Sequence, residues 1–397
     1  MKTLLACSLL VPVALLSGLA RGGDASSAQS LTIGYHVEKL DSLGGTSSSA
    51  QGINDRGWIT GRSNLPDGNR HAVLWRNGRI DDLGTLGGRN SAVLWPVKNL
   101  RGIIVGISQT GEDDPYDEPW SCGAFLGATG TGQRCVGFVW ENGAMRALDT
   151  LGGTHGFATG ANNFGQIVGW AENTVLDPTC DNEANQFFQF RAAIWNRNGR
   201  VVRELPPLEG HSTTAATALN DRGQVVGISG ECDVAVGRRS AIDAVIWENG
   251  VPRRLDDFGG TAWDTPMSIN QRGDIVGFLN ASAEDGDNLN PRAALWLRGR
   301  PVMDLGFLDE GDDNATAYGI NEWRQVVGES CAGGDCRAFL WQNGEMKLLQ
   351  DLVVSGDTLA LLRARDIDDF GRITGQAFDD STGTFVAFVA TPKLVRR

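Results

Sequence analysis

The chain has 397 residues with a formal net charge of −13, and 41% of them are hydrophobic, including 12 tryptophans. Its 53 glycines are about twice the usual share, but only 13 prolines occur, which excludes a disordered Pro/Gly tract. No run of five or more Lys or Arg occurs, so the composition argues against a nucleic-acid partner.

The N-terminus is typical of an export signal. Lys2 supplies a positive start, an apolar run follows, and Gly18 and Ala20 have the small-x-small spacing of a cleavage site. We predict a signal peptide over 1–20, with cleavage as late as 28, and an extracellular or periplasmic location. The run is too short and too close to the N-terminus for a membrane span, so no integral membrane segment is expected.

A nonapeptide repeats along the rest of the chain, as INDRGWITG at 53–61 and LNDRGQVVG at 219–227. The glycine that ends it recurs at spacings of 45, 63, 58, 50, 51 and 47 residues. The positions are Gly61, Gly106, Gly169, Gly227, Gly277, Gly328 and Gly375. Seven such units without a break in composition predict one repeat-built domain over 31–397.

Each unit contains two turn signals. The first is Asn-x-x-Gly, in which Asn opens a type I turn and Gly takes the left-handed conformation. The sixth copy has Arg324 in place of this glycine, so a strained or reshaped turn is expected there. The second signal is Asn-Gly after a tryptophan, as in WRNG at 75–78, which indicates a tight hairpin.

Four strands per unit follow from these turns. In the fourth unit we expect them at 213–220, 224–229, 241–247 and 251–258. Consecutive apolar residues in the middle strands are typical of strands buried on both faces, as in stacked sheets. The arrangement predicts an all-β fold, a seven-bladed β-propeller of four-stranded blades. A different blade number or another all-β repeat are the alternatives.

The two ends of the repeat region complement each other. The segment 35–45 resembles the end of a unit with no strand before it, and the last unit nearly stops after TFVAFVAT at 384–391. We therefore expect an N-terminal strand to complete the last blade, which removes two open sheet edges.

The motifs LGTLGG (83–88), INDRG (53–57) and HAVLWRNG (71–78) resemble the HAF-repeat family of extracellular bacterial proteins. The His-Ala-Phe step of that family is His71-Ala72-Val73 here, and Arg337-Ala338-Phe339 in a later unit, so the histidine is mostly lost. The resemblance covers about 35–390. It implies an exported repeat protein and no known reaction or catalytic residue.

Six cysteines follow the leader, and an even number in an exported chain predicts disulfides. Locality favours Cys122–Cys135 and Cys331–Cys336, which leaves Cys180–Cys232. A zinc site is the alternative, but no CxxC motif occurs and the four histidines are scattered. We predict no metal site.

Successive turns of a propeller blade lie on alternate faces of the ring. The two short turns of each unit lie on the same face, which we call the short-turn face. The opposite, variable face receives the second-to-third loops and the crossings between blades. All length variation lies there, at 108–135, 171–191, 229–240 and 279–291, together with the six cysteines. Loops held by a rigid scaffold carry function, and disulfides lower the cost of ordering them, so we expect the variable face to bind.

Aromatic residues outside the core register are the first binding candidates. Tyr116 and Trp120 lie in an acidic segment at 111–122, and Trp263 lies in the crossing at 259–265. An exposed ring beside acids and amides is a common way to hold a sugar. The alternative is that a tryptophan in a crossing fills a gap in the core.

His155 and His211 occupy nearly equivalent crossings of neighbouring blades, where we expect them close together at the channel mouth. Carboxylates fall in later crossings, at Asp264, Asp312, Asp313 and Asp357. A histidine with a carboxylate can perform acid–base chemistry or bind a metal. A hydrolase or lyase acting on an extracellular polysaccharide is therefore the alternative function, although solvated loop residues are the simpler interpretation.

The acidic runs at 111–118, 283–288 and 309–314 have ligands that suit calcium, but none matches an EF-hand and solvated loops are simpler. We predict no cofactor. The predicted function is that of a monomeric, exported scaffold that binds an extracellular ligand or protein, with a glycan as one candidate, through the variable face.

Overall fold

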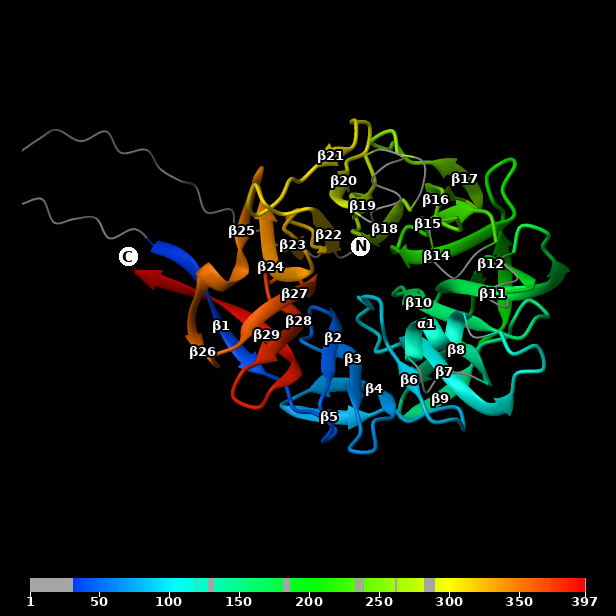
Figure 1. The fold of residues 1–397 in the computed structure, drawn as a ribbon, viewed down its shortest axis with the longest axis horizontal. Helices are drawn as coiled ribbons and strands as arrows, with labels where there is room; N and C mark the ends of the chain where they lie inside the picture. The colour runs from blue at the N-terminus through cyan, green and yellow to red at the C-terminus, as the bar shows by residue number, and fades with distance from the viewer. Residues whose placement is uncertain are drawn as a thin grey trace, which may run out of the picture.

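Seven sheets form a ring around a central axis in this computed structural model (Figure 1). It describes residues 31–118, 120–127, 132–180, 186–232, 237, 239–260, 263–281 and 290–396. The predicted signal peptide lies outside these residues. The prediction of a seven-bladed β-propeller is confirmed.

The first six blades each contain four antiparallel strands in chain order, from the axis to the rim. Blade 1 contains β2 (Ser48–Ile53), β3 (Ile59–Asn64), β4 (Arg70–Arg76) and β5 (Arg79–Asp82). Blade 2 contains β6 (Ser91–Ala92), β7 (Ile104–Asp113), β8 (Gln133–Glu141) and β9 (Ala144–Ala147). Blade 3 contains β10 (Gly156–Ala161), β11 (Ile167–Leu176), β12 (Phe188–Trp195) and β13 (Val201–Leu205). Blade 4 contains β14 (Thr213–Leu219), β15 (Val225–Gly230), β16 (Asp243–Glu248) and β17 (Val251–Arg254). Blade 5 contains β18 (Thr265–Ile269), β19 (Ile275–Leu279), β20 (Arg292–Trp296) and β21 (Met303–Asp304). Blade 6 contains β22 (Asn314–Ile320), β23 (Val326–Ala332), β24 (Asp335–Gln342) and β25 (Glu345–Leu348).

The seventh blade joins both ends of the chain. Its inner strands are β27 (Ala360–Ile367), β28 (Ile373–Asp379) and β29 (Thr384–Arg396), and β1 (Leu31–Lys39) pairs antiparallel with β29. The N-terminal strand therefore completes the last blade, as predicted. A fifth strand, β26 (Val353–Gly356), pairs parallel with β1 and covers its edge; the sequence did not predict it.

The tryptophan of each third strand belongs to the core between blades. The six side chains are at most 7% exposed: Trp75, Trp140, Trp195, Trp247, Trp296 and Trp341. Four of the indoles donate to a main-chain carbonyl oxygen of a crossing, as Trp247 does to Pro206 at 2.8 Å. The repeated tryptophan therefore joins neighbouring blades by packing and by a hydrogen bond.

The Asn-x-x-Gly turns link the blades around the axis. The side-chain oxygen of Asn220 accepts from the amides of its own turn, and its Nδ2 donates to the carbonyl of Asn270 in the next blade. Asp368 of the last blade has no amide to donate, so Arg372 binds it and reaches the carbonyl of Asn54 in blade 1. The polar turns thus join the first and last blades, in addition to the ring closure made by the pairing of β1 with β29.

The exceptional sixth turn keeps the shape of the others. Arg324 has φ 60°, and its amide donates to the carbonyl of Asn321 as the turn glycines do in other copies. The turn is therefore strained, as expected, but not reshaped. The guanidinium forms two contacts of 2.8 and 3.2 Å with the carboxylate of Asp274 in the preceding blade.

Arg324→Gly is expected to change the free energy of unfolding by less than about 1 kcal/mol. Relief of left-handed strain, about 1–2 kcal/mol, offsets loss of a half-exposed ion pair and the added freedom of the unfolded chain. Arg324→Ala loses the pair but keeps the strain, so we expect it to be about 1 kcal/mol less stable than wild type. Urea unfolding measures both variants, and an alanine variant as stable as the glycine variant would contradict the strain.

Candidate functional site

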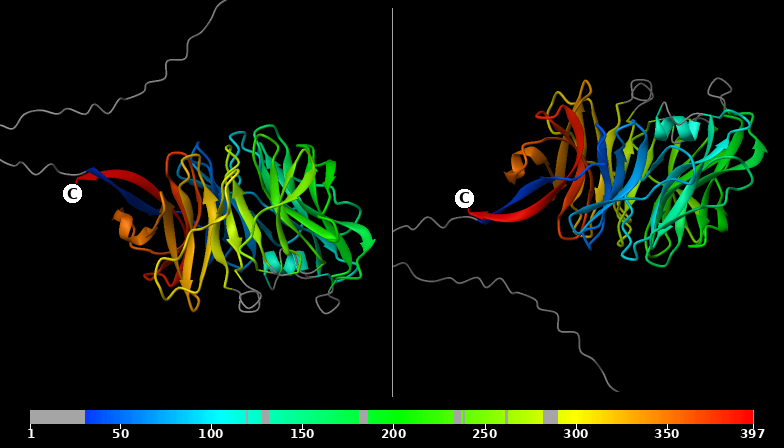
Figure 2. Two further views of the ribbon diagram at one scale, coloured as in Figure 1. Left: turned by 90° about the horizontal axis from the view of Figure 1, so that it is seen from above. Right: turned by 90° about the horizontal axis from the view of Figure 1, so that it is seen from below.

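The turns alternate between faces as predicted. The long β7–β8, β11–β12, β15–β16 and β19–β20 connections lie on the variable face, where Figure 2 shows α1 (Trp120–Leu126). The three predicted disulfides are present: Cys122–Cys135, Cys180–Cys232 and Cys331–Cys336. The second joins the loops of blades 3 and 4, so the loops of this face are tied together.

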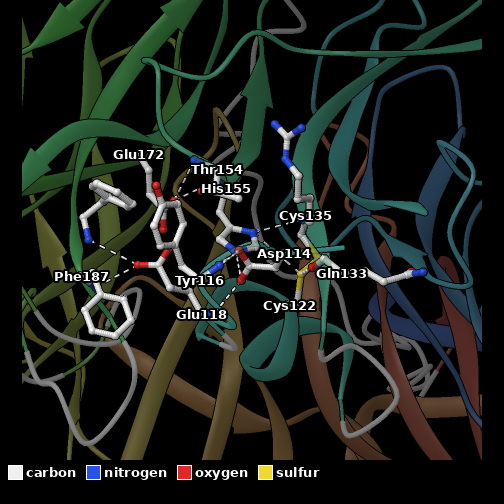
Figure 3. A network of polar contacts seen from close by, with 12 residues as sticks. Asp114, Tyr116, Glu118, Cys122, Gln133, Cys135, Thr154, His155, Glu172 and Phe187 are labelled. Atoms are coloured by element: carbon white, nitrogen blue, oxygen red, sulfur yellow. Dashed lines mark hydrogen bonds and ion pairs between the residues drawn. A yellow bond between two sulfur atoms is a disulfide. The ribbon is translucent and has the colours of Figure 1, made fainter. Parts of the chain in front are cut away.

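His155 is fully buried in a network of polar contacts (Figure 3). Its Nδ1 accepts from the backbone amide of Cys135 at 3.1 Å, and its Nε2 lies 3.0 Å from Oδ2 of Asp114. An imidazole that accepts at Nδ1 carries its proton on Nε2, so His155 donates to Asp114. Burial opposes the charged form, but the contact with Asp114 and the charge of Glu172 outweigh it and raise the pKa of His155.

Two more carboxylates complete this network. Oε2 of Glu172 accepts from the amides of Thr154 and His155. Glu118 accepts from the amides of Phe187 and of the next residue through Oε1, while its buried Oε2 has no hydrogen-bond partner among the described residues. Burial, followed by the charge of Glu172, raises the pKa of Glu118 to about 7. The network therefore ties the 111–118 loop of blade 2 to blade 3.

The network is closed to substrates because His155, Glu118 and Glu172 are at most 1% exposed. Asp114, Glu118 and His155 each offer a ligand atom within 4.8 Å of the others. However, the only lone pair of the neutral imidazole already accepts from Cys135, so a metal would have to displace a proton and break that contact. We assign this cluster a bracing role rather than a metal.

The two candidate histidines do not form the expected pair. His211 lies 3.0 Å from the hydroxyl of Ser229 and 3.7 Å from the carboxylate of Asp243, both in its own blade. Within the described part of the chain it shares no partner with His155. Their positions are also not equivalent. Counted from Ala158 and Ala216, which lie opposite the repeated glycines Gly169 and Gly227, His155 corresponds to Thr213, two residues after His211.

The candidate carboxylates also have local partners. Asp264 is buried and accepts from the amide of Asn280, and burial raises its pKa to about 8. Asp312 accepts from the hydroxyl of Ser330 and pairs with Arg337 at 2.6 Å. Asp313 accepts from the amide of Gly333 and the side chain of Asn314. These carboxylates therefore hold crossings in place and do not converge with either histidine.

Aromatic side chains fill the core around the axis. Trp95, Phe157 and Trp170 are buried together, and Trp263 packs against this cluster. Its ring lies 5.9 Å from that of Phe278 in an edge contact. Trp263 is half-buried, so its ring fills part of the core and its binding role stays a prediction. The side chain of Trp120 lies outside the described residues, so its role stays a prediction.

Tyr116 is the candidate that faces solvent. Its side chain is 49% exposed, and its ring meets that of Phe188 edge-on at 4.9 Å. Both line a groove of about 560 Å³ between blades 2 and 3. Glu112 and Arg134, which form an ion pair of 2.6 Å, and Thr174 also line it. The groove lies beside Thr154 of the buried network.

A second cavity, of about 250 Å³, lies among the Asn-x-x-Gly turns on the short-turn face, to which the sequence interpretation gave no role. The second residue of each turn lines this cavity, whereas the third residue of each turn is exposed: Arg56, Arg101, Phe164, Arg222, Arg272, Trp323 and Phe370. Three of the five exposed aromatic residues among those described are in this set. The signal was available, since this position is Arg or aromatic in all seven copies.

No family model and no curated protein matches the chain. Solved structures match at low similarity. A mutant of AofleA from Arthrobotrys oligospora has a TM-score of 0.39 at 12% identity, over 80% of this chain and 88% of that one. A gluconolactonase of Xanthomonas campestris has a TM-score of 0.29 at 15% identity, over 51% of this chain and 69% of that one. Dipeptidyl peptidase 4 of Porphyromonas gingivalis has a TM-score of 0.31 at 8% identity, over 82% of this chain and 44% of that one. These scores carry no argument about function.

Proposed function

We propose that this protein is an exported propeller that binds a carbohydrate in the groove beside Tyr116. The observation that carries the proposal is an exposed tyrosine ring held by Phe188 above a polar groove. A sugar presents an apolar C–H face that stacks on such a ring, and hydroxyls that need donors and acceptors at the edges. Export and membership of the HAF-repeat family are parts of the same proposal.

The polar residues of the groove suit a neutral or weakly charged sugar. Arg134 and Glu112 neutralise each other at 2.6 Å and still offer donors and acceptors, and Thr174 adds a hydroxyl. Its volume of about 560 Å³ falls in the usual range of ligand pockets. The disulfide Cys122–Cys135 and the His155 network hold the surrounding loop, which lowers the entropy lost on binding.

The geometry favours binding over hydrolysis or elimination of a polysaccharide. Catalysis would need an accessible acid and base at the groove. Among the described residues near it, His155 and Glu118 are buried, and Glu112 is held by Arg134, which leaves Asp113 as the one other carboxylate in the lining. The core beside the axis is apolar, as described above. These contacts leave the proposed enzyme without a free acid–base pair.

Tyr116→Ala is expected to weaken glycan binding by at least tenfold, because the ring supplies most of the apolar contact. The measurement is a glycan array to find the ligand, followed by calorimetry on wild type and variant. Phe164→Ala is the control, since Phe164 is 73% exposed on the opposite face of blade 3. Equal affinity of wild type and Tyr116→Ala, or equal losses in both variants, would refute the groove.

A further inference from the structure

Four arginines gather where blade 7 meets blade 1. Arg62 lies near the end of β3 and Arg70 begins β4, while Arg363 and Arg365 belong to β27. The group joins the two blades that close the ring. None of the four lies in a repeated turn or in a long loop, and the groove beside Tyr116 does not include them.

A backbone bulge places one member of the cluster. The pairing of β27 with β28 shifts between Ala364 and Asp366, so Arg365 is the extra residue of a β-bulge. An equivalent shift in β22 makes Tyr318 the extra residue there. The guanidinium of Arg365 lies 4.0 Å above the ring of Tyr318, a cation–π contact that fixes its plane.

The cluster holds more positive than negative charge. Glu329 binds Arg363 at 2.5 Å and accepts from the hydroxyl of Tyr318. Arg70 donates to the carbonyl of Phe125. No carboxylate among the described residues forms an ion pair with Arg62, Arg70 or Arg365. Arg363 therefore has a carboxylate partner, whereas the other three guanidinium groups have none among the described residues.

Arg62 is the least compensated of the four. Its side chain makes no hydrogen bond or ion pair within the described part of the chain, and its Nε, like those of Arg70 and Arg365, is buried without a partner there. Burial and the charges of Arg70, Arg365 and Arg363 lower the pKa of Arg62 to about 9. A protein gains no stability from such repulsion, so the arrangement points to a negative group that is supplied from outside.

We propose that Arg62, Arg70 and Arg365 bind an oxyanion of a ligand, either a carboxylate or a phosphate or sulfate group. A guanidinium presents two parallel N–H donors that match the oxygens of such a group, and the buried Nε atoms have no other acceptor among the residues that the structure describes. Fixing Arg365 on Tyr318 prepares the site before the anion arrives. The site stands independently of sugar binding beside Tyr116.

The test compares thermal melting of wild type and Arg62→Met with added sodium glucuronate, sodium phosphate or glucose at constant ionic strength. We expect at least one anion, and not glucose, to raise the wild-type midpoint in a saturable way. Arg62→Met should lose at least tenfold in affinity for it. A response to glucuronate alone indicates an organic acid, and a response to phosphate indicates the inorganic or ester group.

Arg101→Met is the matched control, because Arg101 is exposed on the short-turn face, and it should keep the full anion response. Without anion, Arg62→Met should melt at or above the wild-type midpoint, since repulsion is removed, whereas a purely structural arginine would lower it. Arg365→Met provides a second variant with the same expected loss of affinity. Equal anion responses in wild type and both cluster variants, or no response in wild type, would overturn the proposal. Tyr116→Ala should retain the anion response, which separates this site from the groove.

Discussion

Replacing Lys98 by methionine is expected to lower the free energy of unfolding by about 3–5 kcal/mol at pH 8. The Nζ of Lys98 lies 2.8 Å from Oδ1 of Asp366, whose side chain is fully buried. The same ammonium donates to the carbonyls of Ile320 and Ile367 at 2.7 and 2.9 Å. Methionine keeps the length of the side chain but leaves a buried carboxylate without its cation.

The position of Lys98 follows from an interrupted strand. β6 ends at Ala92, and Pro96 cannot donate to a ladder, so the segment after β6 leaves the sheet of blade 2. It carries the ammonium to residues of blades 6 and 7. One lysine therefore links three blades, which is why a single substitution is expected to act on the whole ring.

The loss should depend on pH because Asp366 can take up a proton. Burial raises the pKa of Asp366 to about 6, against the opposing charge of Lys98. A carboxyl whose pKa is raised by folding stabilises the protein most at low pH, and this contribution is lost as the pH rises from about 4 to about 6. Without Lys98 the pKa rises further, so the gap between wild type and variant should widen from pH 5 to pH 8.

Urea unfolding at both pH values measures this gap. Arg200→Met is the control, since it removes an ion pair of 3.2 Å with Asp149 in which both side chains are exposed. We expect the control to lose less than about 1 kcal/mol at either pH. A gap for Lys98→Met that stays constant between pH 5 and pH 8 would show that Asp366 does not titrate as argued.

Local spacing explains why the blades and two of the disulfides were predictable, while Cys180–Cys232 followed by elimination and the ring closure from the incomplete units at the two ends. Turn signals lie within a few residues of each other, and the pair Cys331–Cys336 is separated by 5 residues. The contact of His155 with Asp114 joins two blades, and its direction depends on side-chain rotation that no repeat records. The same holds for Lys98 and for the arginine cluster, which bring together residues more than 200 positions apart.

The bulge in the first strand of six blades was also hidden, because a one-residue shift in pairing leaves no mark in a repeat that these units share. The bulge explains the structural role of the glycine that ends the nonapeptide. That glycine lies in the second strand, beyond the turn, opposite the residue that precedes the bulge, as Gly227 lies opposite Ala216. Its role is therefore close approach of two strands rather than turn geometry.

Gly227→Ala is accordingly expected to cost about 3–5 kcal/mol, more than a turn glycine does. A Cβ at Gly227 would lie 2.0 Å from the carbonyl oxygen of Ala215, and neither strand can move without breaking the ladder. Gly223→Ala is the matched control four residues earlier. Its φ of 74° strains alanine, but the new methyl group would lie 3.9 Å from Oε1 of Gln166, an ordinary contact, so about 1–2 kcal/mol is expected. Urea unfolding of the two variants separates the two causes. Equal losses of unfolding free energy would mean that backbone conformation, and not the close approach of the strands, requires glycine at this position in all seven blades.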